Sequence, residues 1–266
     1  MIPKVIHYCW FGRGEIPEKD RKCIESWKKF CPGYEIIMWN EDNYDVTQND
    51  YMREAYECKK WGFVPDYARL DIVYRYGGFY FDTDVEIIKS IDDLCAYQAF
   101  MGFERADSIA TGLGFGAEPG NEIIKALRDD YEGRHFLQKN GEMDLTPAPT
   151  RARNVLVRFG AQMNGVKQSI DGMTFFPTEY FCPMNYETGE QHITANTYSI
   201  HHYHASWQSP YQRKAHDIYC SCIRKFGEKG KSIALVLSLP YRVANKVNQL
   251  GLKRTVAYIR QKLFAK

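Results

Sequence analysis

The chain has 266 residues, of which 44% are apolar and 26% charged, a composition typical of a soluble globular protein. Its length suits one large domain, or one domain with a small appendage. Uninterrupted apolar runs stay well below the roughly 18 residues that a bilayer requires, which excludes a membrane-spanning helix.

Charge is unevenly distributed along the chain. There are 35 Lys and Arg against 33 Asp and Glu, a formal net charge of +2. Nine of the basic residues and none of the acidic ones lie in 229–266, so an acidic body precedes a basic tail. This asymmetry indicates a surface contact made by the tail. No nucleic-acid recognition motif accompanies the charge, and we expect no nucleic-acid partner.

The eight cysteines are irregularly spaced. No C-x-x-C occurs, and the closest pair, Cys220 and Cys222, has poor spacing for a zinc site. The N-terminus has no basic region followed by an apolar run, so no signal peptide is indicated. We therefore expect reduced thiols in a cytoplasmic protein.

The first 92 residues alternate between strand and helix patterns. Pro32-Gly33 and Gly77-Gly78 end two of the helical segments. In chain order the patterns predict strands over 4–10, 34–39, 79–81 and 85–88, and helices over 18–30, 51–61 and 65–76. Such alternation predicts an α/β fold in which helices cover the faces of a sheet.

The remaining chain is patterned less regularly. The predicted strands are 99–103, 113–117, 174–176 and 197–203, the predicted helices are 122–131, 151–163 and 211–226, and 134–149 is predicted to be a loop. We expect a catalytic domain over 1–228 and a basic helical C-terminal extension over 229–266.

Two acids, Asp82 and Asp84, follow the predicted strand 79–81. Aspartates at i and i+2 at a strand end suit a hard divalent cation, which takes oxygen ligands and keeps water or phosphate in its other positions. Such an ion can bridge the carboxylates to a diphosphate and stabilise a leaving nucleotide. Two solvated acids in a loop would give the same triplet, but here a Gly-Gly break and an aromatic strand precede it.

Asp66 and Arg69 form a second candidate pair. They lie one turn apart on the predicted helix 65–76, so both side chains can point into one pocket. Taken alone, this spacing favours a surface ion pair.

The two pairs belong to one longer motif, D-Y-A-R-x6-Y-G-G-F-Y-F-D-T-D, over residues 66–84. This segment resembles the sugar-binding region of glycosyltransferase family 32, which includes the yeast initiating mannosyltransferase and bacterial capsular polysaccharide enzymes. It is also similar to the catalytic domain of the large clostridial glucosylating toxins. The resemblance implies a glycosyltransferase A-type fold, a Rossmann-like mixed sheet flanked by helices, with a Mn²⁺ or Mg²⁺ ion and retention of anomeric configuration.

The resemblance implies roles residue by residue. Asp82 resembles the acid that contacts ribose and sugar, and Asp84 resembles the direct metal ligand. Asp66 and Arg69 look like the pair that binds sugar hydroxyls and the diphosphate. Tyr80 resembles the aromatic residue that lines the nucleotide site, and Thr83 is included in that site as the central residue of the triplet.

The opening segment Ile2–Gly12 resembles the family's first strand. There a Trp stacks on the nucleotide base, and Trp10 fits because an indole offers a flat apolar face. Tyr8, on the same segment, is also expected in the nucleotide-sugar site. The alternative for Trp10 is packing in the core.

A second cluster reads Ile200-His201-His202-Tyr203-His204-Ala205-Ser206-Trp207. On a strand, His202 and His204 share one face and His201 lies on the other. The cluster resembles the family's C-terminal H-H-x-x-x-S-W motif. By its place relative to the Trp, His202 resembles the third metal ligand beside Asp84 and Asp82, although His204 remains open. Ser206 and Trp207 then look like contacts to the diphosphate and the pocket floor.

The predicted activity is a metal-dependent retaining hexosyltransferase in bacterial capsular or surface polysaccharide synthesis. No residue stands out as a covalent nucleophile, so we expect the acceptor hydroxyl to attack from the leaving-group side. As sugar donors we expect uridine diphosphate sugars in the first place and guanosine diphosphate mannose in the second. We expect an oligosaccharide acceptor, either free or lipid-linked. Its identity is open because 146–150 reads Thr-Pro-Ala-Pro-Thr, whereas members of the family often carry a Gly-Pro loop there.

Two other classes of protein remain as alternatives. A metal-dependent hydrolase or nucleotidyltransferase would also use D-x-D, but would not need Trp10 or Tyr80. A catalytically inactive carbohydrate-binding protein would not need to retain Asp82, Asp84 and His202.

The basic tail carries an imperfect apolar stripe that includes Val243, Val247, Leu250 and Val256. Basic faces with such stripes can lie on anionic bilayers. The sequence therefore predicts peripheral association with the inner face of the cell membrane. The alternative is a pair of helices that pack on the domain with a solvated basic face.

Overall fold

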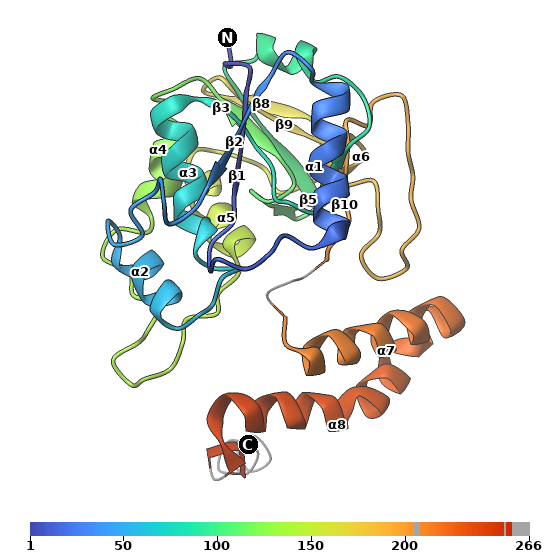
Figure 1. The fold of residues 1–266 in the computed structure, drawn as a ribbon. Helices are drawn as coiled ribbons and strands as arrows, with labels where there is room; N and C mark the ends of the chain where they lie inside the picture. The colour runs from blue at the N-terminus through green and yellow to red at the C-terminus, as the bar shows by residue number, and fades with distance from the viewer. Residues whose placement is uncertain (205–207, 253, 257–266) are drawn as a thin grey trace. The chain divides into compact units, whose positions relative to one another are not determined.

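A computed structural model describes residues 1–204, 208–252 and 254–256 (Figure 1). The chain divides into two compact units. The first contains 1–184 and 191–204, and the second contains 185–190 together with the chain from 205 onward.

The first unit alternates strands and helices, in agreement with the predicted α/β class. Its strands are β1 (Val5–Cys9), β2 (Glu35–Trp39), β3 (Gly78–Tyr80), β4 (Val85–Ile87), β5 (Ala99–Arg105), β6 (Ser108–Ile109), β7 (Phe115–Ala117), β8 (Gln168–Ile170), β9 (Met173–Phe176) and β10 (Ser199–His201). Its helices are α1 (Glu18–Phe30), α2 (Asp50–Glu57), α3 (Pro65–Tyr76), the 3-10 turn η1 (Asp92–Ala96), α4 (Glu122–Asp129), α5 (Ala148–Arg158) and α6 (Thr178–Phe181).

The main sheet is mixed, with the order β2-β1-β3-β7-β5-β9-β8 and β6 paired to β5. Strands β2, β1 and β3 run parallel, β7 is antiparallel to both β3 and β5, and β9 runs parallel to β5. This is the mixed, helix-flanked sheet predicted for a glycosyltransferase A-type fold. A second, two-stranded sheet pairs β4 with β10.

Two apolar cores fill the two faces of the main sheet. Because side chains alternate along a strand, Tyr80 enters one core while Phe79 and Phe81 enter the other. The first core is closed by α2, α3, α4 and α5, and the second by α1 and α6. Figure 1 shows α1 and α3 on opposite sides of the strands.

Local sequence signals predicted most element bounds of the first unit. Helices α1 and α3 begin and end where the sequence analysis placed them, and α3 has Pro65 in its first turn and Gly77 after its last residue. Helix α5 begins at Ala148, earlier than predicted. The predicted strand 197–203 was too long, since β10 ends at His201 and Tyr203 adopts a left-handed φ of 52°.

The second unit contains a helical hairpin of α7 (Pro210–Phe226) and α8 (Gly230–Leu250), joined by the 3-10 turn η2 (Gly227–Lys229). A Ser209–Gln212 capping box starts α7. Gly230 allows close helix approach, since an added Cβ would lie 2.3 Å from the carbonyl oxygen of Cys222. The predicted boundary at residue 228 therefore falls inside this unit, between two helices that pack together.

Gly78 permits the close approach of β3 to β1. Its φ is +94°, and an added Cβ would lie 2.7 Å from the carbonyl oxygen of Val5 and 3.1 Å from Nε2 of His7. A backbone carbonyl within a parallel strand pair cannot move aside without breaking the pairing of β1 with β3.

Gly78→Ala should therefore destabilise the protein more than Gly120→Ala. Both alanines would adopt a left-handed conformation, which costs about 1–2 kcal/mol for an L-residue. At Gly120, however, nothing lies within 4 Å of the added Cβ. Urea unfolding of the two variants measures the difference in the free energy of unfolding, and equal losses would show that no clash exists at Gly78.

Candidate functional site

The side chains of Asp66 and Arg69 meet at the start of α3. Their positions one turn apart place Arg69 Nη2 3.2 Å from Asp66 Oδ1. Each residue is only 5% exposed. The alternative of a surface ion pair is therefore wrong, because the pair is buried.

Arg69 also reaches the segment that follows β3. Its Nη1 lies 3.3 Å from Asp82 Oδ2, and its guanidinium stacks 5.1 Å from the ring centre of Tyr80. The hydroxyl of Tyr80 donates to Asp82 Oδ1 at 2.9 Å. Arg69 Nε donates to the carbonyl of Pro65 at 3.0 Å, which fixes the orientation of the guanidinium. Four of the predicted site residues, Asp66, Arg69, Tyr80 and Asp82, are thus brought together.

Two carboxylates share this one guanidinium, one on the buried Asp66 and one on Asp82, whose side chain is 31% exposed. Burial raises the pKa of Asp66 to about 7, against the opposing charge of Arg69. Burial also raises the pKa of Asp82, again opposed by Arg69. One positive charge cannot fully compensate one buried and one half-buried carboxylate, so this part of the site can accept a hydrogen-bond donor or a cation.

Asp84 is enclosed by the chain that returns at β10. In the antiparallel β4–β10 pair, His201 lies opposite Val85, and its Nε2 is 3.2 Å from Asp84 Oδ1. The backbone N–H of His202 donates to the carbonyl of Asp84 at 3.0 Å, and that of His204 donates to Asp84 Oδ2 at 2.9 Å. Burial disfavours the Asp84 carboxylate, but the charge and hydrogen bond of His201 outweigh it and lower its pKa to about 2.

The three histidines have different partners. His202 Nε2 lies 2.8 Å from Glu86 Oε2, and His204 Nδ1 lies 2.5 Å from Asp20 Oδ1. The rings of His202 and His204 lie on the same side, with centroids 5.7 Å apart, although the left-handed Tyr203 separates them. The histidine in contact with Asp84 is His201, whereas the sequence analysis favoured His202 as the partner of the acids.

His201 also has an unused ring nitrogen. Its Nδ1 is buried and has no hydrogen-bond partner among the described residues. Burial lowers its pKa, but the neighbouring Asp84 carboxylate outweighs this and raises it overall. Asp84 therefore favours the protonated ring while no cation is bound.

No group of three His, Cys, Asp or Glu side chains in metal-ligand geometry occurs within residues 1–204, 208–252 and 254–256. Asp84 and His201 nevertheless supply an oxygen and a nitrogen donor within 3.2 Å of each other, and Asp82 lies two residues from Asp84. Mg²⁺ commonly binds through one or two carboxylates and completes its coordination with substrate phosphates and water. The residues present therefore fit a divalent ion that is completed by a diphosphate.

Of the residues predicted at the opening strand, Trp10 lies at the same edge of the sheet as Asp82, whereas Tyr8 does not. Because β1 and β3 are parallel, Trp10 after β1 and Asp82 after β3 both follow carboxyl ends of strands, the edge at which open α/β sheets bind ligands. The indole of Trp10 donates to the carbonyl of Gly14 at 2.6 Å. Tyr8 is buried in the second core, edge-on to Trp27. Of the remaining predicted residues, Ser206 and Trp207 lie outside the described part of the chain.

Four residues that were not predicted as site residues contact the predicted ones. They are Asp20, Glu86, Thr111 and His201. Thr111 Oγ1 lies 3.5 Å from Arg69 Nη1, and Asp20 accepts a hydrogen bond from Thr83. The signal for His201 is the register of β10 on β4, which places His201 opposite Val85 and therefore next to Asp84. Asp20 has no motif around it and is brought in only by the packing of α1.

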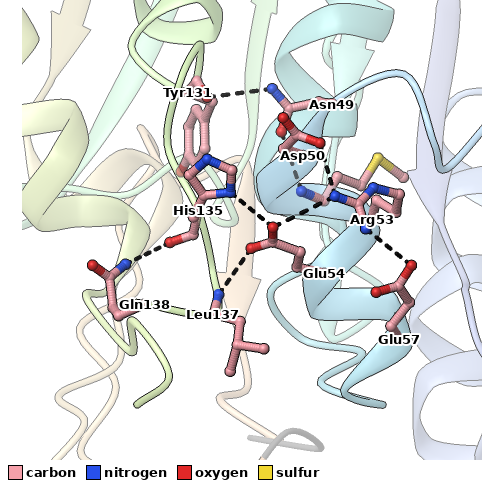
Figure 2. A network of polar contacts seen from close by, with 10 residues as sticks. Asn49, Asp50, Arg53, Glu54, Glu57, Tyr131, His135, Leu137 and Gln138 are labelled. Atoms are coloured by element: carbon pink, nitrogen blue, oxygen red, sulfur yellow. Dashed lines mark hydrogen bonds and ion pairs between the residues drawn. The ribbon is translucent and has the colours of Figure 1, made fainter. Parts of the chain in front are cut away.

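Beyond Asp66 lies a second buried polar group formed by Tyr51, Tyr131 and Arg151. The Arg151 guanidinium lies 5.1 and 5.5 Å from the two tyrosine ring centres. Figure 2 shows how the loop after α4 is held to α2: Glu54 accepts from His135 Nδ1 at 2.8 Å and from the Leu137 N–H at 2.9 Å. These bonds hold Tyr131 in a loop that has little regular secondary structure of its own.

Comparison with known proteins finds a similar region in one family of proteins. Residues 17–101 match the model described as "Glycosyltransferase sugar-binding region containing DXD motif". The match contains Asp66, Arg69, Asp82 and Asp84. Residues 17–101, about a third of the chain, are therefore similar to a glycosyltransferase sugar-binding region that contains a DXD motif. The resemblance stated from the sequence is thereby confirmed.

The relatives match over part of their length. Inositol phosphoceramide mannosyltransferase 3 of Schizosaccharomyces pombe is 32% identical over 108 residues, which are 38% of this chain and 29% of the relative. Inositol phosphoceramide mannosyltransferase 1 of the same organism is 27% identical over 160 residues, 56% of this chain and 47% of the relative. The chain thus spans less than half the length of these curated relatives. Among solved structures, the PaToxG glycosyltransferase aligns with a TM-score of 0.47 and 20% identity, over 59% of this chain and 69% of that one.

Gly112, which follows the matched region in the chain, makes room for the Asp82 carboxylate. A Cβ added at Gly112 would lie 2.2 Å from Asp82 Oδ2 and 3.3 Å from Arg69 Nη1. Because the Asp82 carboxylate is the movable partner, it would shift away from Gly112 and change its contact with Arg69 while the backbone keeps its place.

Gly112→Ala should therefore lower any turnover at this site by about 100-fold, the order expected for a misplacement of about 1 Å at a reacting site. Thermal unfolding should change little. Gly33→Ala is the matched control, since nothing lies within 4 Å of its added Cβ. Equal turnover in the two variants would show that the position of Asp82 is not critical.

Proposed function

We propose that the chain is a divalent-metal-dependent glycosyltransferase that moves a sugar from a nucleoside diphosphate sugar to a hydroxyl of a glycan acceptor. One observation carries the proposal. Within the sugar-binding region, Arg69 joins Asp66 to Asp82, two residues from the Asp84–His201 pair. A buried cationic bridge beside a metal-competent acid suits a diphosphate that carries a neutral sugar.

The metal ligands in this proposal are Asp84 and His201, with Asp82 as a further carboxylate. We assign His201 in place of His202 because His201 Nε2 contacts Asp84, whereas His202 is paired with Glu86. A bound Mn²⁺ or Mg²⁺ ion would supply charge stabilisation to the departing diphosphate. Asp66 would accept hydrogen bonds from sugar hydroxyls, and the Arg69 guanidinium would donate hydrogen bonds to the nucleoside diphosphate sugar.

The reaction forms a bond between the acceptor hydroxyl oxygen and the anomeric carbon. The bond from that carbon to the diphosphate oxygen breaks, and the nucleoside diphosphate leaves with the bonding electrons. We propose attack from the leaving-group side, so that the acceptor proton passes to the departing diphosphate and the configuration is retained. No covalent enzyme intermediate is needed in this scheme.

The donor and the pathway are proposed more broadly. Uridine diphosphate sugars are the first donors to test. Guanosine diphosphate mannose stands beside them, because two relatives are named mannosyltransferases. We propose a role in bacterial capsular or surface polysaccharide synthesis, with an oligosaccharide acceptor that is carried on a lipid.

Asp84→Ala and His201→Ala should both weaken Mn²⁺ binding, and His202→Ala should not. Loss of a ligand should cost at least the roughly 10–100-fold that residues around a metal site contribute. Titration of Mn²⁺ in the presence of uridine diphosphate measures the affinity, and metal-dependent hydrolysis of a sugar-nucleotide panel measures turnover. Weaker Mn²⁺ binding by His202→Ala, with normal Mn²⁺ binding by His201→Ala, would show that His202 is the metal ligand.

We also propose peripheral membrane association through the second unit. No helix of the described residues is long and apolar enough to cross a membrane. The stripe of α8 that packs inward is small or polar, with Ala234 and Ser238 buried. Its large apolar side chains are exposed instead: Ile233, Leu235, Val236, Leu237, Leu239 and Val243. Exposed apolar patches of this kind mark interaction surfaces.

Charge favours an anionic lipid surface as the partner of α8. Lys229, Lys231, Arg242 and Lys246 accompany the exposed apolar residues, and no acid occurs from 229 to the last residue. Each basic residue near an anionic bilayer contributes about 1 kcal/mol to binding. A lipid-carried acceptor would place the substrate at the same surface.

Val236→Ser with Leu239→Ser should therefore reduce co-sedimentation with vesicles of phosphatidylglycerol and phosphatidylcholine. Val166→Ser with Ile193→Ser is the matched control, because these exposed apolar residues belong to the first unit. Raising the salt concentration should release the wild-type protein by screening the basic residues. No binding by wild type, or equal binding by both variants, would contradict the proposal.

A further inference from the structure

Asp20 is a buried acid on α1 that belongs to none of the predicted motifs. It is 2% exposed, although it lies only two residues into the helix. Its Oδ2 accepts a hydrogen bond from Thr83 Oγ1 at 3.1 Å, and its Oδ1 lies 2.5 Å from His204 Nδ1. A buried carboxylate is costly unless it is hydrogen-bonded, so this position requires both partners.

The two partners of Asp20 flank Asp84 in different segments. Thr83 precedes Asp84 in the chain, and the backbone N–H of His204 donates to Asp84 Oδ2. Asp20 therefore connects the D-x-D turn, through Thr83, to the segment after β10, through His204. It does not contact the Asp84 carboxylate itself by any hydrogen bond of the described residues.

Helix α1 is itself fixed to the strand that follows Asp84. Trp27 Nε1 donates to the carbonyl of Val85 at 2.7 Å, and the N–H of Ile87 donates to Ser26 Oγ at 2.9 Å. Trp27 is fully buried. Because α1 is held to β4 in this way, Asp20 is presented to Thr83 and His204 from a rigid element.

We propose that Asp20 is a positioning residue that fixes the orientation of the Asp84 carboxylate toward a divalent cation. It acts by holding Thr83 and His204 on the two sides of Asp84. This inference rests on the proposed function. Residues that orient metal ligands without touching the metal typically change metal affinity by about 10–100-fold when they are removed.

The test compares full-length variants for binding of Mn²⁺ alone, followed by electron paramagnetic resonance of the free ion. Asp20→Ala should bind Mn²⁺ about 10–100-fold more weakly than wild type. Thr83→Val removes one of the two hydrogen bonds at nearly constant shape and should have a smaller effect in the same direction. Glu25→Gln is the control, since Glu25 is exposed on the same helix.

A second readout separates positioning from general stability. If Asp20 acts through the metal site, turnover of Asp20→Ala should recover as Mn²⁺ is raised. Turnover that stays low at every Mn²⁺ concentration, with wild-type Mn²⁺ affinity, would overturn the inference. If Asp20→Ala does not fold, Thr83→Val decides, and unchanged Mn²⁺ affinity in that variant overturns the inference as well.

The outcome for wild type distinguishes this inference from the proposed function. If wild-type protein binds Mn²⁺ and the Asp20 variants bind it equally well, only the role of Asp20 is wrong. Wild-type protein that does not bind Mn²⁺ removes the metal-dependent function, and the role of Asp20 is then wrong with it.

Discussion

The rest of the site depends on the ion pairs that the buried guanidinium of Arg69 makes with Asp66 and Asp82. The guanidinium joins α3 to the segment after β3 through Asp66 and Asp82, and it stacks on Tyr80 between them. Removing a buried ionic partner leaves an uncompensated charge, which costs several kcal/mol. The helix start and the D-x-D turn are therefore fixed relative to each other. Burial raises the pKa of Asp66, and the Asp82 carboxylate adds to this rise while Arg69 opposes it.

Asp84 is held in a different way, by segments that are far apart in sequence. Its carboxylate receives the side chain of His201 and the N–H of His204 from the chain after β10, while Asp20 on α1 holds the neighbouring Thr83. The D-x-D triplet thus has an acid bound to Arg69 on one side and an acid bound to the C-terminal segment on the other. Their pKa values diverge: burial raises that of Asp82 despite Arg69, whereas His201 outweighs burial at Asp84 and lowers its pKa to about 2.

The second unit follows a different packing rule. Small and polar side chains, among them Ala234 and Ser238, face inward on α8, and leucines and valines remain exposed. A soluble helix normally buries its apolar face. The sequence indicated a basic tail, but the apolar stripe expected at Val243–Val256 is only the end of a surface that begins at Ile233. Which side of α8 packs could not be read from periodicity, since apolar residues surround most of the helix.

Local signals in the sequence determined helices α1 and α3, the Gly-Gly break, the α/β class and the D-x-D region, because caps, breaks and motif residues act within a few positions of each other. The tertiary structure decided which histidine meets Asp84. His201 does so through the antiparallel register of β10 on β4, a pairing across more than 100 residues that no local pattern encodes. The left-handed Tyr203 then turns His204 toward Asp20. Asp20 itself becomes part of the site only through the packing of Trp27 on β4, because burial and proximity are properties of the folded chain.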